Sequence, residues 1–214
     1  EPYEQGIKTV LAFTNSNNIE LNEFSPGGGF AIGYVQNSLP PSVESYAEII
    51  TKTLKSTCSD LGIRPPKLVI EPGRSIIGRA GVAVYTVGAI KDIPSVRKYV
   101  SLDGGMGDNV RPAMYDAKYS AVIVNRVVDN SEELVSLAGK YCESGDILIK
   151  DIKLPVLETG DIIAIPASGA YSPSMASSYN LNPRPPMVMV LEGEARLIRR
   201  REEYQDYLMF DVSK

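Results

Sequence analysis

The spacing of hydrophobic residues changes near residue 77, and this change restricts the folds open to the chain. Before residue 77, helical spacing over residues 7–12 and 42–61 alternates with short apolar runs at 19–24 and 68–70 that are typical of strands. This strand–helix–strand order is characteristic of α/β folds. A parallel sheet needs both faces covered and its edges paired, so two such strands do not complete a domain. We therefore expect residues 1–76 to be the last part of a larger α/β domain, with its N-terminal portion missing from this chain.

The second part, residues 77–214, is rich in short β-branched runs separated by clusters of Gly, Pro, Asp and Asn. Strands spaced in this way favour an antiparallel barrel or sandwich. The charged run 199–203 is expected to begin a short solvated helix near the end of the chain. The predicted strands are 82–90, 99–102, 121–128, 147–149, 162–165 and 187–191.

The chain contains no histidine, which excludes a Ser-His-Asp or Cys-His arrangement and any His-based zinc site within these 214 residues. Two cysteines, Cys58 and Cys142, are too few for a Cys-rich metal site, so we expect free thiols and no metal. The formal net charge of −4 argues against non-specific binding of nucleic acid. No apolar run approaches the ~20 residues of a membrane span. We expect a cytoplasmic chain.

Two loops that follow the predicted strands of the first part carry residues suited to ligand binding. Gly28 and Gly29 belong to a run of three glycines, which could bring backbone N–H groups to a phosphate or simply form a tight turn. The segment Glu71-Pro72-Gly73-Arg74 follows residues 68–70, at the strand end where α/β barrels keep their active-site residues. Its acid could point into a barrel mouth and its arginine could bind a carboxylate through two hydrogen bonds. The alternative is a turn with a surface ion pair.

Arg111 and Tyr115 lie four residues apart in a predicted short helix, with Asp108 or Asn109 as its N-cap and Pro112 in its first turn. This spacing puts both side chains on one face of the helix. An arginine beside a tyrosine could recognise a carboxylate. The pair could equally be a surface arginine stacked on a tyrosine.

Cys142 and Glu143 place a thiol beside an acid in the turn-rich segment Tyr-Cys-Glu-Ser-Gly-Asp. A cysteine in such a setting could donate a proton or act as a nucleophile, although lone cysteines more often pack as small buried residues. Tyr171, in the segment Gly-Ala-Tyr-Ser, offers a hydroxyl after the predicted strand 162–165 or is an ordinary loop tyrosine.

Taken together and in order, the motifs Gly-Gly-Gly, Glu-Pro-Gly-Arg, Asp-Gly-Gly with Arg-Pro-x-x-Tyr, Cys-Glu-Ser-Gly-Asp and Gly-Ala-Tyr-Ser closely resemble those of the diaminopimelate decarboxylases. The resemblance runs from about Leu21 to Arg201. It implies an α+β multidomain protein, in which the end of an alanine-racemase-like α/β (TIM) barrel precedes a Greek-key antiparallel β-barrel domain. It also implies decarboxylation of meso-diaminopimelate to L-lysine by a homodimer whose active sites are shared between subunits.

The resemblance further implies roles for individual residues. Gly28 and Gly29 would hold the phosphate of the cofactor, pyridoxal 5′-phosphate, and Glu71 would face its pyridine nitrogen. The neighbouring Pro72 and Gly73 would complete that cofactor loop.

Substrate contacts are implied for Arg74, Arg111, Tyr115 and Tyr171, with Arg74 and Tyr171 also close to the cofactor. Glu143 would pair with the distal ammonium of the substrate. Cys142 would be the proton donor, and the turn that carries Cys142 and Glu143 would come from the partner subunit.

The resemblance is incomplete at two positions. The family holds its cofactor through a lysine at the end of the first barrel strand and stacks a histidine on its ring, and neither occurs in that context here. Both groups are expected in the missing N-terminal portion, so this chain alone should be inactive. Two alternatives stay open: another fold-type III enzyme, such as an ornithine or arginine decarboxylase or an alanine racemase, or a non-catalytic homologue that binds or regulates an active protomer.

Overall fold

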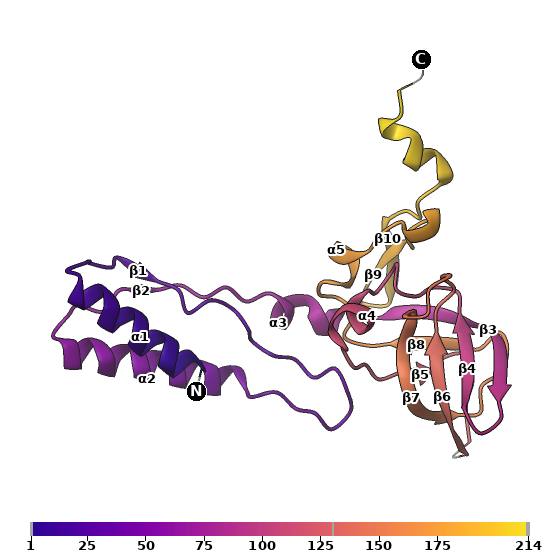
Figure 1. Ribbon diagram of the computed structural model, residues 1–214, viewed down its shortest axis with the longest axis horizontal. Coiled ribbons are helices and arrows are strands. Elements are labelled where there is room, and N and C mark those ends of the chain that lie inside the picture. The colour runs from indigo at the N-terminus through magenta and orange to yellow at the C-terminus, as the bar shows by residue number, and fades with distance from the viewer. Residues whose placement is uncertain (1, 130, 213–214) are drawn as a thin grey trace. The chain divides into compact units, whose positions relative to one another are not determined.

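The computed structural model describes residues 2–129 and 131–212, and it divides into two compact units, Glu1–Arg79 and Ala80–Lys214 (Figure 1). Each unit has a hydrophobic core of its own. No helix in the described part of the chain combines the length and the apolar character needed to cross a membrane.

The first unit alternates helices with short strands, as its hydrophobic spacing predicts. Its two strands pair in parallel, Glu23 with Lys67 and Phe24 with Leu68. The predicted strand 19–24 is therefore reduced to its last two residues, and the predicted strand 68–70 shares only Leu68 with the strand observed. The elements are α1 (Pro2–Ser16), β1 (Glu23–Phe24), α2 (Val43–Leu61) and β2 (Lys67–Leu68).

The core of the first unit lies between α1 and α2. Ile7 and Leu11 are four residues apart on α1, so they share one helix face, and both are almost fully buried. They pack in one cluster with Ile50, Leu54 and Cys58 of α2, and this burial of apolar surface is the main stabilising interaction of the unit.

The ends of α2 follow the signals in the sequence. The backbone N–H of Ser45 donates to the Ser42 hydroxyl at 3.1 Å, so Ser42 is the N-cap, as predicted. At the other end Gly62 adopts the left-handed conformation with φ 67°, and the N–H of Ile63 donates to the Cys58 carbonyl at 3.0 Å. A residue with a side chain would be strained there, which is why the helix ends at this glycine.

Replacing Leu11 with Ala should lower the free energy of unfolding of the first unit by about 2–5 kcal/mol, because the side chain is fully buried and its removal leaves a cavity. Urea unfolding of the full chain measures the change. Leu39→Ala is the matched control: that leucine is 92% exposed, and its loss should cost less than about 0.5 kcal/mol. Equal effects of the two substitutions would contradict the packing of α1 on α2.

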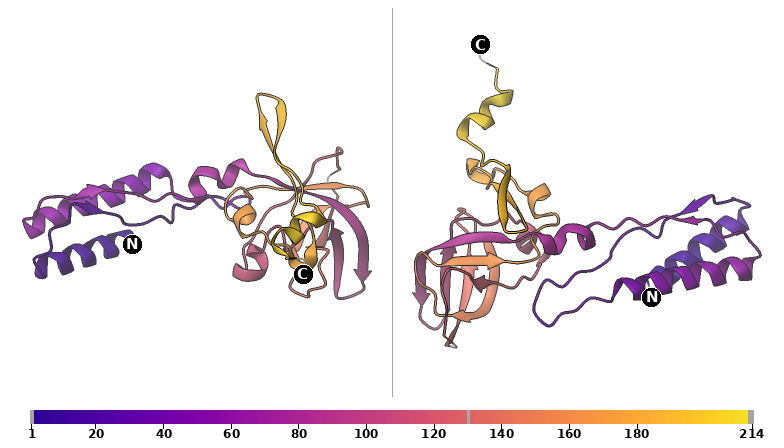
Figure 2. Two further views of the ribbon diagram at one scale, coloured as in Figure 1. Left: turned by 90° about the horizontal axis from the view of Figure 1, so that it is seen from above. Right: turned by 180° about the vertical axis from the view of Figure 1, so that it is seen from behind.

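The second unit is built on a six-stranded sheet that curls into a nearly closed barrel (Figures 1 and 2). The strand order is β5-β8-β3-β4-β6-β7. Val100, Val135, Leu137 and Ile163 are completely buried, so the inner face of the sheet forms the core. The strands are β3 (Ala83–Ile93), β4 (Arg97–Leu102), β5 (Val122–Ile123), β6 (Glu132–Ala138), β7 (Ile147–Pro155) and β8 (Ile162–Ile165).

The sheet departs from the sequence prediction in three respects. The β4–β6 pair is parallel, so the expectation of a wholly antiparallel sheet is wrong at this pair. The strand predicted at 121–128 is reduced to β5, and β6 was not predicted. The Greek-key connection and the derivation of the first unit from a TIM barrel stay predictions.

A separate antiparallel hairpin follows the barrel, formed by β9 (Met187–Leu191) and β10 (Glu194–Arg199). Glu192 and Gly193 both have positive φ, 52° and 84°, which is the backbone geometry of a tight type I′ turn. β10 occupies the position at which the charged run was expected to start a helix, so that expectation is wrong for Arg199.

Five short helical segments connect or extend these elements. They are α3 (Arg74–Ile77), η1 (Gly78–Ala80), α4 (Arg111–Tyr115), α5 (Ser172–Met175) and η2 (Tyr179–Leu181).

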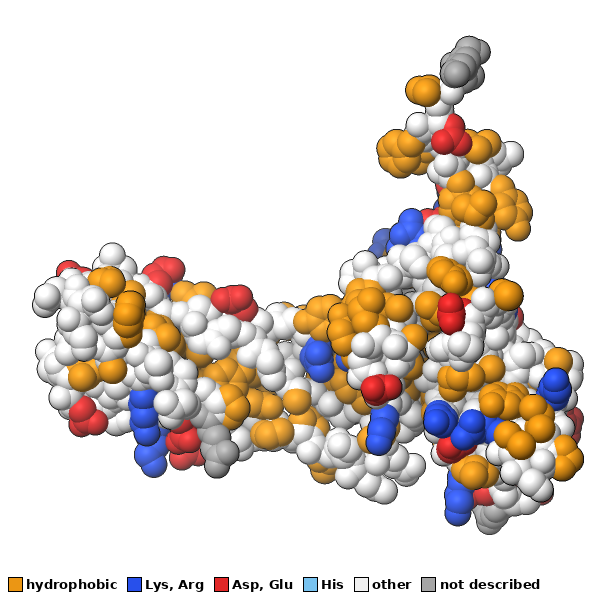
Figure 3. All heavy atoms as spheres, in the orientation of Figure 1, with side chains coloured by type: hydrophobic (Ala, Val, Ile, Leu, Met, Phe, Trp, Pro, Cys, Tyr) orange, Lys and Arg blue, Asp and Glu red, His pale blue; other side chains and the backbone are white. Residues whose placement is uncertain are grey.

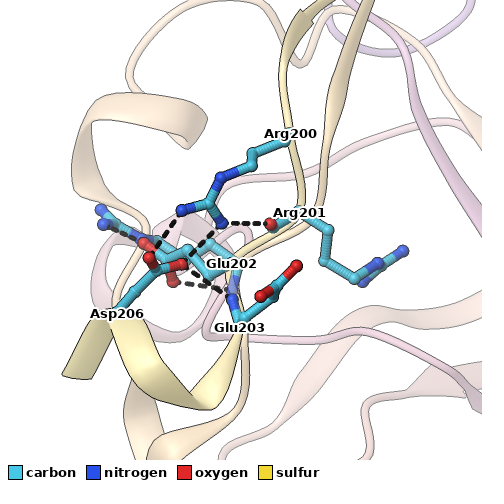
Figure 4. Close-up of polar contacts among 6 residues, drawn as sticks. Arg200, Arg201, Glu202, Glu203 and Asp206 are labelled. Atoms are coloured by element: carbon cyan, nitrogen blue, oxygen red, sulfur yellow. Dashed lines mark hydrogen bonds and ion pairs between the residues drawn. The ribbon is translucent and has the colours of Figure 1, made fainter. Parts of the chain in front are cut away.

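The chain ends in a 3₁₀ helix, η3 (Tyr204–Phe210), whose hydrophobic side chains are largely exposed (Figure 3, top). Ion pairs hold its beginning: Arg200 binds both carboxylate oxygens of Asp206, at 2.7 and 2.6 Å (Figure 4). The Asp206 carboxylate also accepts from the N–H of Glu203 at 2.8 Å. Arg200 and this N–H together lower the pKa of Asp206 from its ordinary 3.8 to about 2.

The ordering of η3 should therefore depend on pH. The Asp206 contribution is fully present above pH 3.8 and should be lost as the pH falls through about 2, because a carboxyl with a depressed pKa stabilises only its charged form. Amide hydrogen exchange across η3 measures this. Asp206→Asn should give low protection factors, the intrinsic exchange rate divided by the observed one, that no longer vary over this pH range. Asp211→Asn, a control just after η3, should behave as the parent chain. A pH response that survives Asp206→Asn would contradict the assignment.

Candidate functional site

The first unit brings its two predicted loops into direct contact. The N–H of Glu71 donates to the Gly27 carbonyl at 3.1 Å, and the Ser25 hydroxyl donates to Glu71 Oε1 at 2.6 Å. A Cβ at Gly28 would overlap the carbonyl oxygen of Glu71, so only glycine allows this approach. The Tyr3 hydroxyl donates to the Gly28 carbonyl and anchors the loop to α1.

The rest of this cluster lies directly after Glu71. Pro72 is partly buried, Gly73 is exposed, and Arg74 begins α3. The guanidinium of Arg74 lies over the ring of Tyr34, 5.7 Å from its centroid, a cation–π arrangement. Gly29, with φ 88°, completes a loop whose backbone a side chain would strain. The glycine loop, Glu71 and Arg74 thus follow two adjacent parallel strands at their carboxyl ends.

The second unit brings together two motifs that are 40 residues apart. The carboxylate of Asp146 accepts one hydrogen bond from the N–H of Met106 at 2.6 Å and another from the N–H of Tyr141 at 2.8 Å. The Asp146 side chain is only 3% exposed. It therefore connects the Asp-Gly-Gly-Met loop to the turn that carries Cys142.

Within that turn, Cys142 and Glu143 are exposed. The Glu143 carboxylate accepts from the N–H of Gly145 at 3.3 Å and from the Tyr179 hydroxyl at 3.4 Å. The rings of Tyr141 and Tyr179 meet edge to face, 5.7 Å apart. Neither Cys142 nor Cys58 forms a disulfide, as predicted, and Cys142 is the thiol that solvent can reach.

Arg111 lies at the start of α4 and is 7% exposed. Its Nη1 donates to the Tyr119 hydroxyl at 2.6 Å, and its guanidinium lies over the Tyr119 ring. Tyr115 is 60% exposed. Arg111 thus contacts Tyr119, an aromatic residue that the spacing rule for helices overlooks because it lies beyond the end of α4.

The cap of α4 also differs from expectation. Its N-cap is Val110, with no side-chain hydrogen bond, and not Asp108 or Asn109. Asp108 instead accepts from the N–H of Gly105 at 3.0 Å, while Asn109 Oδ1 accepts from the N–H of Arg111 at 3.3 Å. Both polar side chains stabilise the loop before the helix.

Tyr171 follows the barrel strand β8 and precedes α5. Its φ of 68° is unusual for a residue with a side chain, and the ring is 43% exposed. The segment is tied to the other motifs, since the N–H of Ser177 donates to the Gly107 carbonyl at 2.9 Å. Gly107 itself packs so closely on the Tyr141 ring that a Cβ would overlap the phenol.

Burial dominates the electrostatics around these loops. Desolvation raises the pKa of Asp146 and of Asp108, although backbone N–H groups bound to each carboxylate oppose the shift. Desolvation also raises the pKa of Tyr141, which the nearby Asp108 and Asp146 raise further. No group of three or more His, Cys, Asp or Glu able to hold a metal ion occurs in residues 2–129 and 131–212.

The structure thus forms two clusters. Gly28, Gly29, Glu71 and Arg74 lie in the first unit, and the loops of Cys142, Glu143, Arg111 and Tyr171 lie in the second. Sequence reasoning gave no role to Asp146, Tyr119 or Tyr179. Asp146 is the last residue of the Cys-Glu-Ser-Gly-Asp motif, and its place in that motif could have indicated a role. No sequence motif indicates a role for Tyr119 or Tyr179.

The chain is similar to known enzymes along nearly its whole length. The family described as "Pyridoxal-dependent decarboxylase, C-terminal sheet domain" matches residues 21–169. The chain belongs to the pyridoxal-dependent decarboxylases. This membership implies pyridoxal phosphate as the cofactor, as the motifs predicted.

Individual relatives support the more specific resemblance. Diaminopimelate decarboxylase of Bacillus subtilis is 48% identical over 98% of this chain and 48% of its own length, and that of Staphylococcus aureus is 45% identical over 99% and 50%. The crystal structure of diaminopimelate decarboxylase from M. jannaschii in co-complex with L-lysine matches all of this chain and 49% of that chain, with 36% identity and a TM-score of 0.90. The chain therefore spans about half the length of the relatives it matches.

Gly28→Ala should lower the free energy of unfolding by about 1–3 kcal/mol, because the new Cβ overlaps the Glu71 carbonyl and must push the two loops apart. Gly6→Ala is the matched control: nothing lies within 4 Å of a Cβ there, and the position is in α1. Alanine favours helix, so Gly6→Ala should raise the stability by about 0.5–1 kcal/mol. Urea unfolding compares the two; a neutral Gly28→Ala would contradict the close contact.

Proposed function

We propose that the complete protein decarboxylates meso-2,6-diaminopimelate to L-lysine and CO₂ with pyridoxal phosphate. The observation that carries this proposal is the exposed Cys142–Glu143 turn within a chain that is 48% identical to the Bacillus subtilis diaminopimelate decarboxylase. This chain contributes residues from both clusters to that reaction.

The residues of the first unit suit pyridoxal phosphate. The three consecutive glycines leave their backbone N–H groups uncovered by Cβ atoms, and successive N–H groups of this kind can bind an anionic phosphate. Gly28 and Gly29 would bind the phosphate, and Pro72 and Gly73 shape the neighbouring loop. Glu71, already fixed by Ser25, would keep the pyridine nitrogen protonated. When bound, the cofactor supplies an electron sink for the bond that breaks.

The residues of both units suit a substrate with two carboxylates and two ammonium groups. Arg111, buried and fixed by Tyr119, would bind a carboxylate, with Arg74, Tyr115 and Tyr171 as further contacts. Glu143 would pair with the distal ammonium and so select a diamino acid. Its carboxylate is oriented by its contact with the Tyr179 hydroxyl.

Cys142 would donate the proton that replaces the lost carboxylate on the α-carbon of the substrate. Its exposure makes the thiol accessible to a substrate. In this proposal the turn serves the active site of a partner subunit, so the enzyme works as a homodimer. The chain spans about half the length of its relatives, and in this proposal the Schiff-base lysine and the stacking histidine lie in the other half. A cytoplasmic location is proposed on the same resemblance.

The test is release of CO₂ from meso-diaminopimelate by protein expressed from the complete coding sequence and loaded with pyridoxal phosphate. We expect L-lysine as the product, with little turnover of ornithine or arginine. Preferred turnover of ornithine or arginine would replace the proposal with another fold-type III decarboxylase. Release of CO₂ from none of them would favour a non-catalytic homologue.

Replacing Cys142 with Ala in this protein should reduce kcat by about 10²–10⁴-fold, the usual contribution of a positioned general acid. Cys58→Ala is the matched control, since Cys58 is buried in the α1–α2 core. Its loss should lower the melting temperature and leave kcat near the parent value. Steady-state kinetics measure kcat for both variants. A kcat equal to that of the parent in the Cys142 variant would show that the thiol is not the proton donor.

A further inference from the structure

We propose that Asp146 is a positioning residue, whose buried carboxylate sets the place of the Cys142–Glu143 turn relative to the Asp-Gly-Gly-Met loop. This inference rests on the proposed function and extends it to a residue that touches neither cofactor nor substrate in that proposal.

The contacts of Asp146 connect two loops that share no strand. Oδ1 accepts from the N–H of Met106 at 2.6 Å, and Oδ2 accepts from the N–H of Tyr141, the residue before Cys142, at 2.8 Å. The backbone of Asp146 adds to the link, because its N–H donates to the Glu143 carbonyl at 3.1 Å. One residue thus holds both ends of the turn and the facing loop.

The residues around the Asp146 carboxylate leave room for it because they are glycines. A Cβ on Gly105 would lie 2.5 Å from Oδ1, and a Cβ on Gly139 would overlap the carboxylate. Both neighbours are glycine, so the carboxylate lies directly against backbone. Hydrogen bonds to a charged acceptor in such a water-poor place are stronger and more directional than exposed ones.

The position of the turn matters for the chemistry, because the exposed side chain of Cys142 is placed by the backbone of the turn that carries it. The thiol and the Glu143 carboxylate are exposed, and the two residues lie between the Tyr141 N–H and the Asp146 backbone. If the turn shifts by about 1 Å, proton donation should slow by about 10²-fold. Asp146 therefore acts on the reaction through Cys142.

The test is Asp146→Asn in protein expressed from the complete coding sequence and loaded with pyridoxal phosphate. An amide offers one acceptor oxygen, so its NH₂ group must face one of the two backbone N–H groups, and the hydrogen bond to that N–H is lost. Hydrogen exchange at the amides of Met106 and Tyr141 should become at least several-fold faster. We expect kcat to fall by about 10- to 100-fold, while the cofactor content read from absorbance is unchanged.

Asp161→Asn is the matched control. Asp161 is also 3% exposed and belongs to the same unit, but it binds Arg126 at 2.7 and 2.9 Å and the N–H of Glu158. Its replacement should lower the melting temperature and leave kcat and the exchange at Met106 and Tyr141 unchanged. If Asp146→Asn yields no folded protein, Asp146→Ser, whose single small hydroxyl cannot reach both N–H groups, should give the same kinetic and exchange changes.

The outcomes separate the two proposals. A kcat within twofold of the parent for Asp146→Asn, or an equal loss in Asp161→Asn, would overturn the positioning role. If the parent protein releases no CO₂ from meso-diaminopimelate, the proposed function fails. Hydrogen exchange then still decides whether Asp146 holds the turn: faster exchange at Met106 and Tyr141 supports it, and unchanged exchange overturns it.

Discussion

Contact between glycine and a neighbouring polar group is the constraint on which both halves of the candidate site depend. In the first unit, Gly28 lies against the carbonyl of Glu71, and the missing side chain lets the ends of β1 and β2 meet. In the second unit, Gly139 lies against the carboxylate of Asp146, and the missing side chain lets a charged group enter the core of a loop cluster. In each unit the close contact fixes the backbone of a loop, and that loop carries the side chains of the candidate site. A fixed backbone holds these side chains more precisely than contacts between surface side chains would.

The elements that the sequence predicts well are those specified by local signals. The helix α2 begins at the Ser42 cap and ends at Gly62, both of which act within a few residues. The strands β8 and β9 match their predicted ranges because each is a compact apolar run bounded by turn residues. The strand β6 was missed since its sequence is mixed, and it is defined by pairing with two other strands, β7 and the more distant β4.

The candidate site shows the same division between local and distant information. Residue types and their order predict that Glu71 and Cys142 belong to functional loops, because those motifs are contiguous in the chain. The partner of Arg111 is different: helical spacing favours Tyr115, whereas the structure pairs Arg111 with Tyr119 after the chain has turned at Asp116. The link from Asp146 to Met106 spans 40 residues and depends on the closing of the barrel, which no local pattern encodes.

The buried carboxylate of Asp146 also has a consequence for how such sequences can drift. A larger residue at Gly105 or Gly139 collides with that carboxylate, and a smaller or uncharged residue at position 146 leaves at least one of the N–H groups of Met106 and Tyr141 without its acceptor. Each of these changes therefore costs the link at least one of its hydrogen bonds or displaces the carboxylate. The Asp-Gly-Gly-Met loop and the Cys142–Glu143 turn therefore constrain each other's sequence, so that a change in one requires a compensating change in the other.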